Sequence, residues 1–442
     1  MAVKDKDHFT GGNTEGGITS SYATNDGVKL KVSYSFMGSI YDDAERNAAL
    51  NAMAQDTLTM GPKTKEFQTK FAAYHKVKHA MACTNCTTGM TVISQIFGIG
   101  PGDEVIVTSN TFWATILVIF QQGATPVFAD IDPRTFNIDP VDVERKITSR
   151  TKAIYVVHYA GLMVDMDPIM ELAKQHNLLV LEDCAHATGA MYKGRYAGSI
   201  GDMGSFSFHS LKNITTCGEG GMITTNNDEY AEAAANLRCM NNTVQWRSFN
   251  NTWQFGDKIT VVKNDALEYW KPAHFDVIPY HGKWGSNFRM NEIQAAVGCC
   301  QVDKIPMLTE KRREIAHKIT AGLQDIKGIE PVYEPEDRLH VYHLYTLCVN
   351  ESELGASRDE FMRILYEEEG IQTILHYQPA YHFTALKKLG YDQNQCPNAN
   401  EFFYKRETNL PMHPRLTEQN IEDMVNGIRN AAAKCHKRHC KA

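Results

Sequence analysis

Between residues 79 and 225 the chain alternates short apolar runs with longer segments of helical character. Four of the runs span residues 104–108, 125–130, 153–158 and 178–183. Short continuous apolar runs are typical of strands that are covered on both faces, and the helices between them provide the crossovers that parallel pairing requires. The alternation therefore predicts an α/β fold in which a parallel sheet lies between helices, with ligands at the carboxyl ends of the strands.

The chain is long enough for more than one domain. At 442 residues it exceeds the size at which a single hydrophobic core stops growing. We expect an irregular amino-terminal arm at 1–32, a large domain at 33–290, and a long connecting helix with a small domain at 291–442. The stretch 239–284 is polar, aromatic and too long for an ordinary connection, which predicts an irregular insertion in the large domain.

The segment after residue 290 predicts the elements of the smaller α/β domain. A helical pattern runs from 290 to about 325, and Pro306 is expected to interrupt it. Strands are expected at 343–349 and 372–377. Further helices are expected at 358–369, 398–409 and 417–434.

Composition and charge narrow the class of protein. Hydrophobic residues make up 43% of the chain and charged residues 22%, which is typical of a globular protein. The net charge of −7 gives no general attraction to nucleic acid or to anionic membranes. The first residues lack the apolar core of a secretory signal, and no apolar stretch is as long as a bilayer-spanning helix requires. We therefore expect a cytoplasmic protein without nucleic-acid or membrane partners.

The cysteines fit the same expectation. There are 11 of them at irregular spacings, which is typical of free thiols in a reducing compartment. Cys83 and Cys86 have the spacing of a redox or zinc pair, but no second pair follows at the distance of a zinc ribbon. We interpret the Cys- and His-containing tract 435–440 as a cationic helix end. No metal site is expected.

Two residues in this framework suggest a particular cofactor chemistry. Lys212 stands among apolar residues before a glycine-rich loop at 218–221, and Asp183 ends an apolar run. A buried lysine has a lowered pKa, so it can form a Schiff base with an aldehyde cofactor and then act as a base. A carboxylate at a strand end can keep a pyridine nitrogen protonated, which makes the ring an electron sink. In this order the two residues indicate pyridoxal phosphate chemistry; the alternatives are a surface lysine and a capping aspartate.

Other side chains can complete such a site. His186 can bind a phenolic oxygen of the cofactor, and the residues 85–88 begin a helix after a strand, where N–H groups and hydroxyls favour phosphate. Ser207 can add a hydroxyl, and Phe112 or Trp113 can stack on a planar ring. Helix capping and core packing are the structural alternatives for these residues.

In their order along the chain these motifs resemble the DegT/StrS family of pyridoxal-phosphate sugar aminotransferases, within the fold-type-I superfamily. The resemblance covers about residues 33–430. It implies a large domain with a mostly parallel seven-stranded sheet between helices and a smaller C-terminal α/β domain. The matching segments are 59–62, 85–87, 109–112, 182–186, 207–212, 218–221, 287–292 and 410–414.

The resemblance implies a role for each matched residue. Lys212 would form the Schiff base, Asp183 would pair with the pyridinium nitrogen and His186 with the phenolic oxygen. Phe112 would stack on the ring. These assignments make Lys212, Asp183 and His186 the catalytic residues.

The phosphate and substrate positions follow from the same resemblance. Cys86 and Thr87 would offer backbone N–H groups to the phosphate, and Thr87 and Ser207 their hydroxyls. Asn287 would reach the phosphate of a neighbouring subunit, which implies a homodimer with shared active sites. The expected substrate contacts are Thr59, Gly61, His376 and Tyr377.

The implied activity is transfer of an amino group from L-glutamate or L-glutamine to a keto sugar. The acceptor would be nucleotide-linked, a keto sugar acid or a keto-cyclitol. Two half-reactions at one lysine predict ping-pong kinetics. One departure from the family is Cys86, which stands where glycine is usual. Its side chain is expected to leave less space for the phosphate at this turn.

Three other functions remain open at this point. A pyridoxal phosphate enzyme can instead catalyse elimination, dehydration or oxidation, although relatives that remove a hydroxyl replace the lysine with histidine. A cofactor-binding regulator without turnover would be expected to have lost one of the catalytic residues. A dinucleotide-dependent dehydrogenase is disfavoured because the turn at 84–88 has no G-x-G-x-x-G motif.

Overall fold

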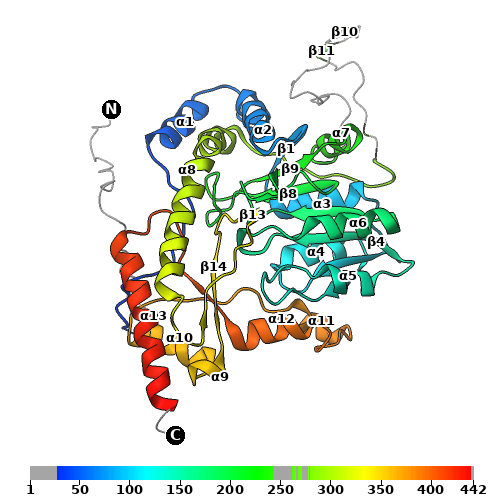
Figure 1. Ribbon diagram of the computed structural model, residues 1–442. Coiled ribbons are helices and arrows are strands. Elements are labelled where there is room, and N and C mark those ends of the chain that lie inside the picture. Colours follow the sequence, from blue (N-terminus) through cyan, green and yellow to red (C-terminus); the bar gives the residue numbers. More distant parts are fainter. Residues whose placement is uncertain (1–26, 242–260, 265–266, 271–276, 278, 440–442) are drawn as a thin grey trace, which may run out of the picture.

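The structure is a computed structural model that describes residues 27–241, 261–264, 267–270, 277 and 279–439 (Figure 1). Most of the predicted arm at 1–32 and much of the predicted insertion at 239–284 lie outside the described residues, as does Cys440 at the end of the Cys- and His-containing tract. Two strands within the insertion are described, β10 (Val261–Asn264) and β11 (Leu267–Trp270), and they pair antiparallel.

A seven-stranded sheet forms the centre of the molecule. Five of its neighbouring strands pair parallel, whereas β9 runs antiparallel to both of its neighbours. The predicted α/β fold with a mostly parallel sheet is therefore confirmed. In sheet order the strands are β1 (His79–Cys83), β9 (Gly221–Thr225), β8 (Met203–Ser207), β5 (Leu179–Asp183), β4 (Thr151–Val157), β2 (Glu104–Thr108) and β3 (Thr125–Ala129).

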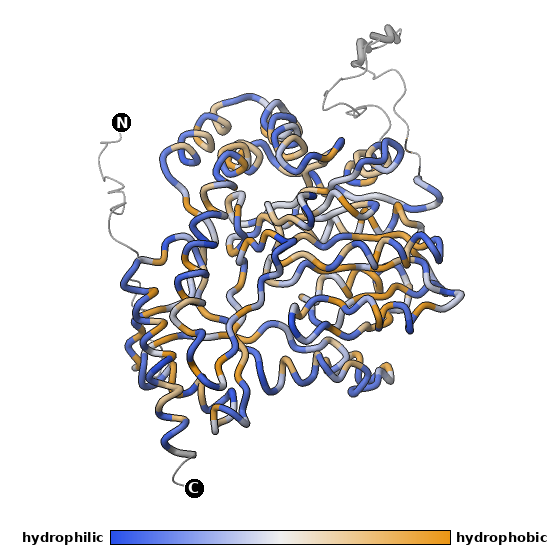
Figure 2. The backbone as a smooth tube through the Cα atoms, in the orientation of Figure 1, coloured by the Kyte–Doolittle hydropathy of each residue, from blue (hydrophilic) through white to orange (hydrophobic). Residues whose placement is uncertain are grey.

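The strands are apolar on both faces because both faces are covered. In β2, Val105 and Val107 pack into one hydrophobic cluster, and Ile106 between them packs into the other. Alternate residues of a strand point to opposite faces, so a continuous apolar run fills two layers at once. Figure 2 shows the resulting band of hydrophobic residues along the sheet.

Helices cover the two faces of the sheet. One face carries α3 (Cys86–Ile96), α4 (Trp113–Gln121) and α7 (Asp228–Leu237). The other face carries α2 (Pro62–His75), α5 (Pro140–Lys146), α6 (Met166–His176) and the first half of α8 (Glu292–Leu323), and α1 (Asp43–Met53) packs on α8. The remaining elements of this part are the turn η1 (Tyr159–Gly161) and a small sheet of β6 (Met191–Tyr192), β7 (Arg195–Tyr196) and β13 (Arg338–Leu339).

The prediction that Pro306 interrupts the long helix is wrong. Helix α8 continues through Pro306, and Asn291 caps its start by accepting the N–H of Gln294. Proline removes one backbone donor, but Ile305 and Leu308 on either side are buried against the large-domain core. Tertiary packing therefore holds the helix together across the proline.

A third hydrophobic cluster, built around a three-stranded antiparallel sheet, forms the C-terminal part. Its strands are β12 (Ile329–Glu330), β14 (Tyr345–Val349) and β15 (Glu407–Leu410). The other elements are α9 (Glu351–Leu354), α10 (Arg358–Glu367), η2 (Ala380–His382), α11 (Thr384–Lys388), α12 (Pro397–Glu401), η3 (Phe402–Arg406) and α13 (Glu418–His439).

Two secondary-structure predictions in this part are wrong. The predicted helix at 398–409 ends early, because β15 pairs with β14 and buries Leu410 in the C-terminal core. The predicted strand at 372–377 is reduced to a single bridge between Ile374 and Asn409. Its later N–H groups bind side chains instead of a neighbouring strand. In both cases tertiary contacts outweigh the local pattern.

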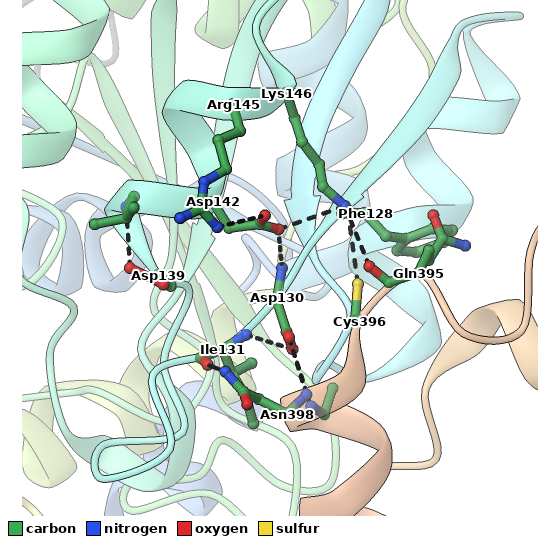
Figure 3. Close-up of polar contacts among 12 residues, drawn as sticks. Phe128, Asp130, Ile131, Asp139, Asp142, Arg145, Lys146, Gln395, Cys396 and Asn398 are labelled. Atoms are coloured by element: carbon green, nitrogen blue, oxygen red, sulfur yellow. Dashed lines mark hydrogen bonds and ion pairs between the residues drawn. The ribbon is translucent and has the colours of Figure 1, made fainter.

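Part of the C-terminal chain packs on the large sheet. Asp130, just after β3, accepts the N–H groups of Asn398 and Ala399 at the start of α12, each at 2.9 Å (Figure 3). Lys146 reaches the carbonyl of Phe128 at 2.6 Å and lies beside the carbonyl of Gln395. The segment around α12 is thus attached to the carboxyl end of β3.

None of the described helices combines the length and the apolar character that crossing a membrane requires.

Candidate active site

A cavity of about 440 Å³ opens at the carboxyl ends of the central strands. We call one group of its lining residues the strand-end set, because each either ends a strand of the large sheet or follows one within a few residues: Asn85, Cys86, Thr87, Phe112, Asp183, His186, Ser207 and Lys212. We call a second group the distal set, because its members precede or follow all strands of the large sheet in the sequence: Tyr34, Ser35, Met37, Gly38, Ile374, His376, Tyr377, Met412 and His413.

Asp183 is the last residue of β5 and is almost completely buried. Its Oδ2 accepts a hydrogen bond from Thr115 Oγ1 at 2.7 Å, and its Oδ1 accepts one from the N–H of Ala185 at 3.0 Å. The Cys86 thiol lies 3.8 Å from Oδ1. The carboxylate is therefore held in one orientation at the edge of the cavity, where it can pair with a protonated ring nitrogen.

Lys212 lies on the loop that follows β8 and extends into the same cavity. Burial lowers the pKa of its amine to about 8, against the opposing effect of the Asp183 carboxylate. The amino-terminal chain approaches this loop closely at Gly38, whose N–H donates to the carbonyl of Ser210 at 2.8 Å. A side chain at Gly38 would collide with the carbonyl of Leu211, so glycine is required at this contact. A partly neutral amine in this position can act as nucleophile and base.

His186 lies three residues beyond the end of β5 and is buried. Burial, and then the nearby amine of Lys212, hold the pKa of the imidazole well below its usual range. Its Nε2 lies 3.3 Å from the hydroxyl of Tyr377, and its ring lies 4.2 Å from that of His343. Its Nδ1 is buried without a partner among the described residues. A buried donor or acceptor of this kind is usually paired, which is consistent with a ligand that binds there.

The start of α3 presents N–H groups that can bind an anion. Asn85 caps the helix by accepting the N–H of Thr88 at 2.9 Å. Cys86 and Thr87 are the first two helical residues, and a helix cannot pair such N–H groups internally. Ser207 ends β8 and lines the cavity with them. These groups are suited to a phosphate.

Phe112 offers a surface for a planar ring. Its side chain is 60% exposed, although it lies directly before the buried helix α4. Its ring centroid is 6.0 Å from that of Tyr377. An aromatic face left open beside a lysine, a carboxylate and an anion site fits pyridoxal phosphate, so the residues present are compatible with that cofactor.

The described chain does not bring every predicted residue to this cavity. Thr59 pairs with Asn291 in an isolated bridge, and the N–H of Gly61 donates to Glu292 at 2.7 Å. Neither residue lines the cavity. Asn287 also lies outside its lining, and its predicted contact with a neighbouring subunit stays a prediction. His376 and Tyr377 do line it.

Sequence reasoning missed several lining residues. Tyr34, Ser35 and Gly38 lie near the start of the described chain, and His343 lies just before β14. No motif marks the first three, because their place depends on contacts with residues more than 170 positions away, such as the bond from Gly38 to Ser210. His343 could have been noticed as a polar residue beside an apolar strand.

A second cluster near the site has a structural explanation. His158, Glu182 and Cys184 lie close enough to share a metal ion, and all three are buried. However, Glu182 Oε2 binds His158 Nε2 at 2.9 Å and the N–H of Gly198 at 3.0 Å. Nδ1 of His158 accepts the N–H of Val164 at 3.2 Å. Protein partners therefore already occupy the potential ligand atoms of His158 and Glu182.

Comparison with known proteins agrees with this geometry. Residues 40–429 match the model of the DegT/DnrJ/EryC1/StrS aminotransferase family. The chain is 38% identical to the spore coat polysaccharide biosynthesis protein SpsC of Bacillus subtilis, over 84% of this chain and 90% of that protein. It is 37% identical to GDP-perosamine synthase of Caulobacter vibrioides, over 87% of this chain and 94% of that protein.

A solved structure shows the same fold with the predicted cofactor. The PLP-form of the putative sugar aminotransferase Spr1654 from Streptococcus pneumoniae matches with a TM-score of 0.76 and 28% identity, over 91% of this chain and 99% of that one. The expected fold class and cofactor are thereby confirmed. With the lysine, carboxylate and anion site gathered in one cavity, the chain belongs to the DegT/DnrJ/EryC1/StrS family of pyridoxal-phosphate-dependent sugar aminotransferases.

Proposed function

We propose that this protein transfers an amino group from L-glutamate or L-glutamine to a keto sugar. The acceptor is nucleotide-linked, a keto sugar acid or a keto-cyclitol. The observation that carries the proposal is the cavity in which the amine of Lys212, with its pKa lowered to about 8, lies near the oriented carboxylate of Asp183. Relatives that include GDP-perosamine synthase support a sugar as the acceptor.

The strand-end set would hold the cofactor. Lys212 would bind it covalently, and Asp183 would keep its ring nitrogen protonated. Nδ1 of His186, which has no partner among the described residues, can bind the phenolic oxygen, and Phe112 can cover one face of the ring. Cys86 and Thr87 would bind the phosphate through their backbone N–H groups, and Thr87 and Ser207 would add hydroxyls.

When bound, pyridoxal phosphate supplies an electron sink and a carrier for the amino group. Lys212 Nζ, once free of its covalent link, removes the proton from the α-carbon of the donor and then delivers it, as base and then acid. The negative charge of the Asp183 carboxylate stays in one place throughout, opposite the position of the protonated ring nitrogen, because Thr115 and Ala185 donate hydrogen bonds to its two oxygens. The acceptor then reacts at the same residues, with the steps of the first half-reaction in reverse order. Ping-pong kinetics are therefore expected.

We also propose that the enzyme works in the cytoplasm as a homodimer with shared active sites. Asn287 would contact the phosphate in the second subunit. Its position outside the cavity of its own chain supports this arrangement. We further propose that a large domain ends at residue 290 and that a small domain follows it.

The test is the visible absorbance of the purified protein during titration with L-glutamate. We expect a visible band that bleaches as 2-oxoglutarate is released, and that returns when a keto sugar is added. A band that neither glutamate nor glutamine changes would contradict the proposed donor. A protein that takes up no cofactor would contradict the proposed site.

A further inference from the structure

A short stretch without regular secondary structure, residues 374–377, carries three residues of the distal set into the cavity. Its backbone is bound from both sides. Ile374 and Asn409 exchange two backbone hydrogen bonds, of 2.8 and 3.2 Å. The hydroxyl of Tyr159 donates to the carbonyl of His376 at 2.7 Å. The segment therefore has a fixed path although it is not part of a strand in any of the described sheets.

Glu407 provides another of these contacts from β15. Its Oε1 accepts the N–H of His376 at 2.7 Å, and its Oε2 accepts Nδ2 of Asn409 at 2.8 Å. The side chain is fully buried, and no ion pair is formed with it among the described residues. Burial raises the pKa of this carboxyl well above its usual range. A carboxyl is costly in such a place, and an apolar residue would pack there without that cost.

The hydrogen bond to His376 gives a reason for the carboxyl. A backbone N–H buried without an acceptor is also costly, and an apolar side chain at position 407 would leave this one unpaired. The bond fixes the peptide next to Tyr377, whose own N–H donates to Oδ1 of Asn110 at 3.1 Å. The carboxyl thus holds the backbone from which the Tyr377 side chain extends.

Tyr377 in turn contacts a residue of the strand-end set. Its hydroxyl lies 3.3 Å from Nε2 of His186, and the two rings stack with an interplanar angle of 22°. A phenol donates readily to a neutral imidazole nitrogen, and with the Tyr377 hydroxyl as donor to Nε2 the ring proton of His186 lies on Nδ1. Nδ1 is the atom that has no partner among the described residues.

We propose that Glu407 is a positioning residue of the active site. Through the N–H of His376 it keeps the Tyr377 hydroxyl against His186, and so it selects the imidazole form whose Nδ1 donates a hydrogen bond to the cofactor. This proposal rests on the cofactor role of His186 given above, but not on the identity of the amino donor or acceptor.

The experiment compares four variants as holoenzymes. Glu407→Leu removes the acceptor of the His376 N–H, whereas Glu407→Gln keeps an oxygen for it. Tyr377→Phe removes only the hydroxyl that contacts His186. The matched control is Tyr345→Phe on β14, in the same three-stranded sheet as Glu407. It removes a partly buried hydroxyl bond of 2.8 Å to Thr320, and no hydrogen bond joins the Tyr345 hydroxyl to His186 or to the 374–377 segment among the described residues.

The measurement is the pH midpoint at which the visible band of the bound cofactor changes. We expect Glu407→Leu and Tyr377→Phe to shift the midpoint in the same direction by about one pH unit, the size of effect that one hydrogen bond has on a titration. Glu407→Gln and Tyr345→Phe should keep the wild-type midpoint. A crystal structure of Glu407→Leu should show the Tyr377 hydroxyl displaced from His186.

Two results would overturn the proposal. One is a wild-type midpoint in Glu407→Leu; the other is a shift in Tyr345→Phe as large as in Glu407→Leu, which would reveal a general effect of destabilisation. If Glu407→Leu does not fold, Tyr159→Phe removes the bond to the carbonyl of His376, the other backbone group through which this residue is held, and a wild-type midpoint there would equally contradict the proposal. Because the midpoint requires only bound cofactor, a failure to accept glutamate would count against the proposed function and not against the role of Glu407.

Discussion

The strand-end set and the distal set line one cavity but are built in different ways. Each member of the strand-end set ends a strand of the large sheet or follows one by a few residues, so the sheet itself brings the set together. The distal set comes from residues 34–38, 374–377 and 412–413, which meet only through long-range contacts such as the bond from Tyr34 Oη to the carbonyl of Asn409. The titratable groups near Lys212 are thus carried by the regular scaffold, and the rest of the cavity wall is assembled from irregular segments.

This difference predicts different responses to mutation. Changes in the strand-end set should remove chemistry while leaving the fold intact, since the sheet is held by its two apolar layers. Changes in the contacts that gather the distal set should alter substrate binding and stability together.

Lys212→Ala should have the largest effect. In the proposed mechanism the amine is both the covalent attachment point and the base, so amino transfer should fall by about 10³-fold or more. The measurement is the rate of the half-reaction with L-glutamate, together with the visible spectrum. Lys388→Ala, an exposed lysine away from the cavity, is the control and should behave as wild type. Wild-type transfer by Lys212→Ala would contradict the central assignment.

Glu182→Gln tests the residue next to Asp183. Glu182 has a structural role, because it binds His158 and the N–H of Gly198. Burial alone would raise the pKa of Glu182, but hydrogen bonds from His158 and from the N–H groups of Gly198 and Gly201 lower it. An amide leaves part of this buried network unpaired, so unfolding free energy should drop by about 3–5 kcal/mol.

Chemical denaturation measures that loss, and kcat of the folded enzyme should stay near the wild-type value. Exposed Glu310→Gln is the control. A large fall in kcat with unchanged stability would show that Glu182 takes part in the chemistry, and the contrast with Asp183 would be wrong.

Asp183→Ala should lower kcat by about 10²–10³-fold, because it removes a fixed charge from the reacting ring. Its effect on the thermal midpoint should be smaller than that of Glu182→Gln. Thr115→Val removes only the bond of 2.7 Å to Oδ2 and should cause a partial loss of activity. If Asp183→Ala unfolded the protein without a specific catalytic defect, its role would be structural.

The pH dependence of cofactor binding tests the environment of Lys212. The pKa of the free amine is lowered to about 8, and only the neutral amine attacks an aldehyde. The rate at which apoenzyme regains its visible band should therefore rise about tenfold per pH unit below that pKa and level off above it. A rate that keeps rising to pH 10 would show that the lysine retains an ordinary pKa.

Asp130→Ala should have the smallest effect. Asp130 holds the start of α12 against the large sheet (Figure 3), so its loss should cost about 1 kcal/mol of stability and raise the KM for the acceptor while kcat is kept. Asp132 accepts two N–H groups within its own turn, from Arg134 and Thr135. Asp132→Ala is therefore the control. An equal rise in its KM would mean that the attachment of α12 to Asp130 does not influence acceptor binding.

The sequence alone predicted the strand-end set well. The apolar runs located the strands, and polar residues at their ends marked Asp183, His186 and Lys212 before any fold was known. The same reasoning failed for residues 372–377 and 398–409. Local pattern could not show that Glu407 and Asn409 would pair with β14 and with Ile374, because those partners are far away in the chain.

By itself, then, the sequence determined the sheet, its cofactor end and the residue types available for chemistry, since these follow from hydrophobic periodicity and strand-end position. Only the tertiary structure decided the rest. It brought Gly38 against the loop that carries Lys212, and it placed Tyr377 beside His186. It also buried Glu407 against the segment 374–377, to which Tyr377 belongs. The physical reason is that strand-end residues are ordered by the short-range geometry of the sheet, whereas the distal residues are ordered only when segments hundreds of positions apart satisfy one another's buried hydrogen bonds.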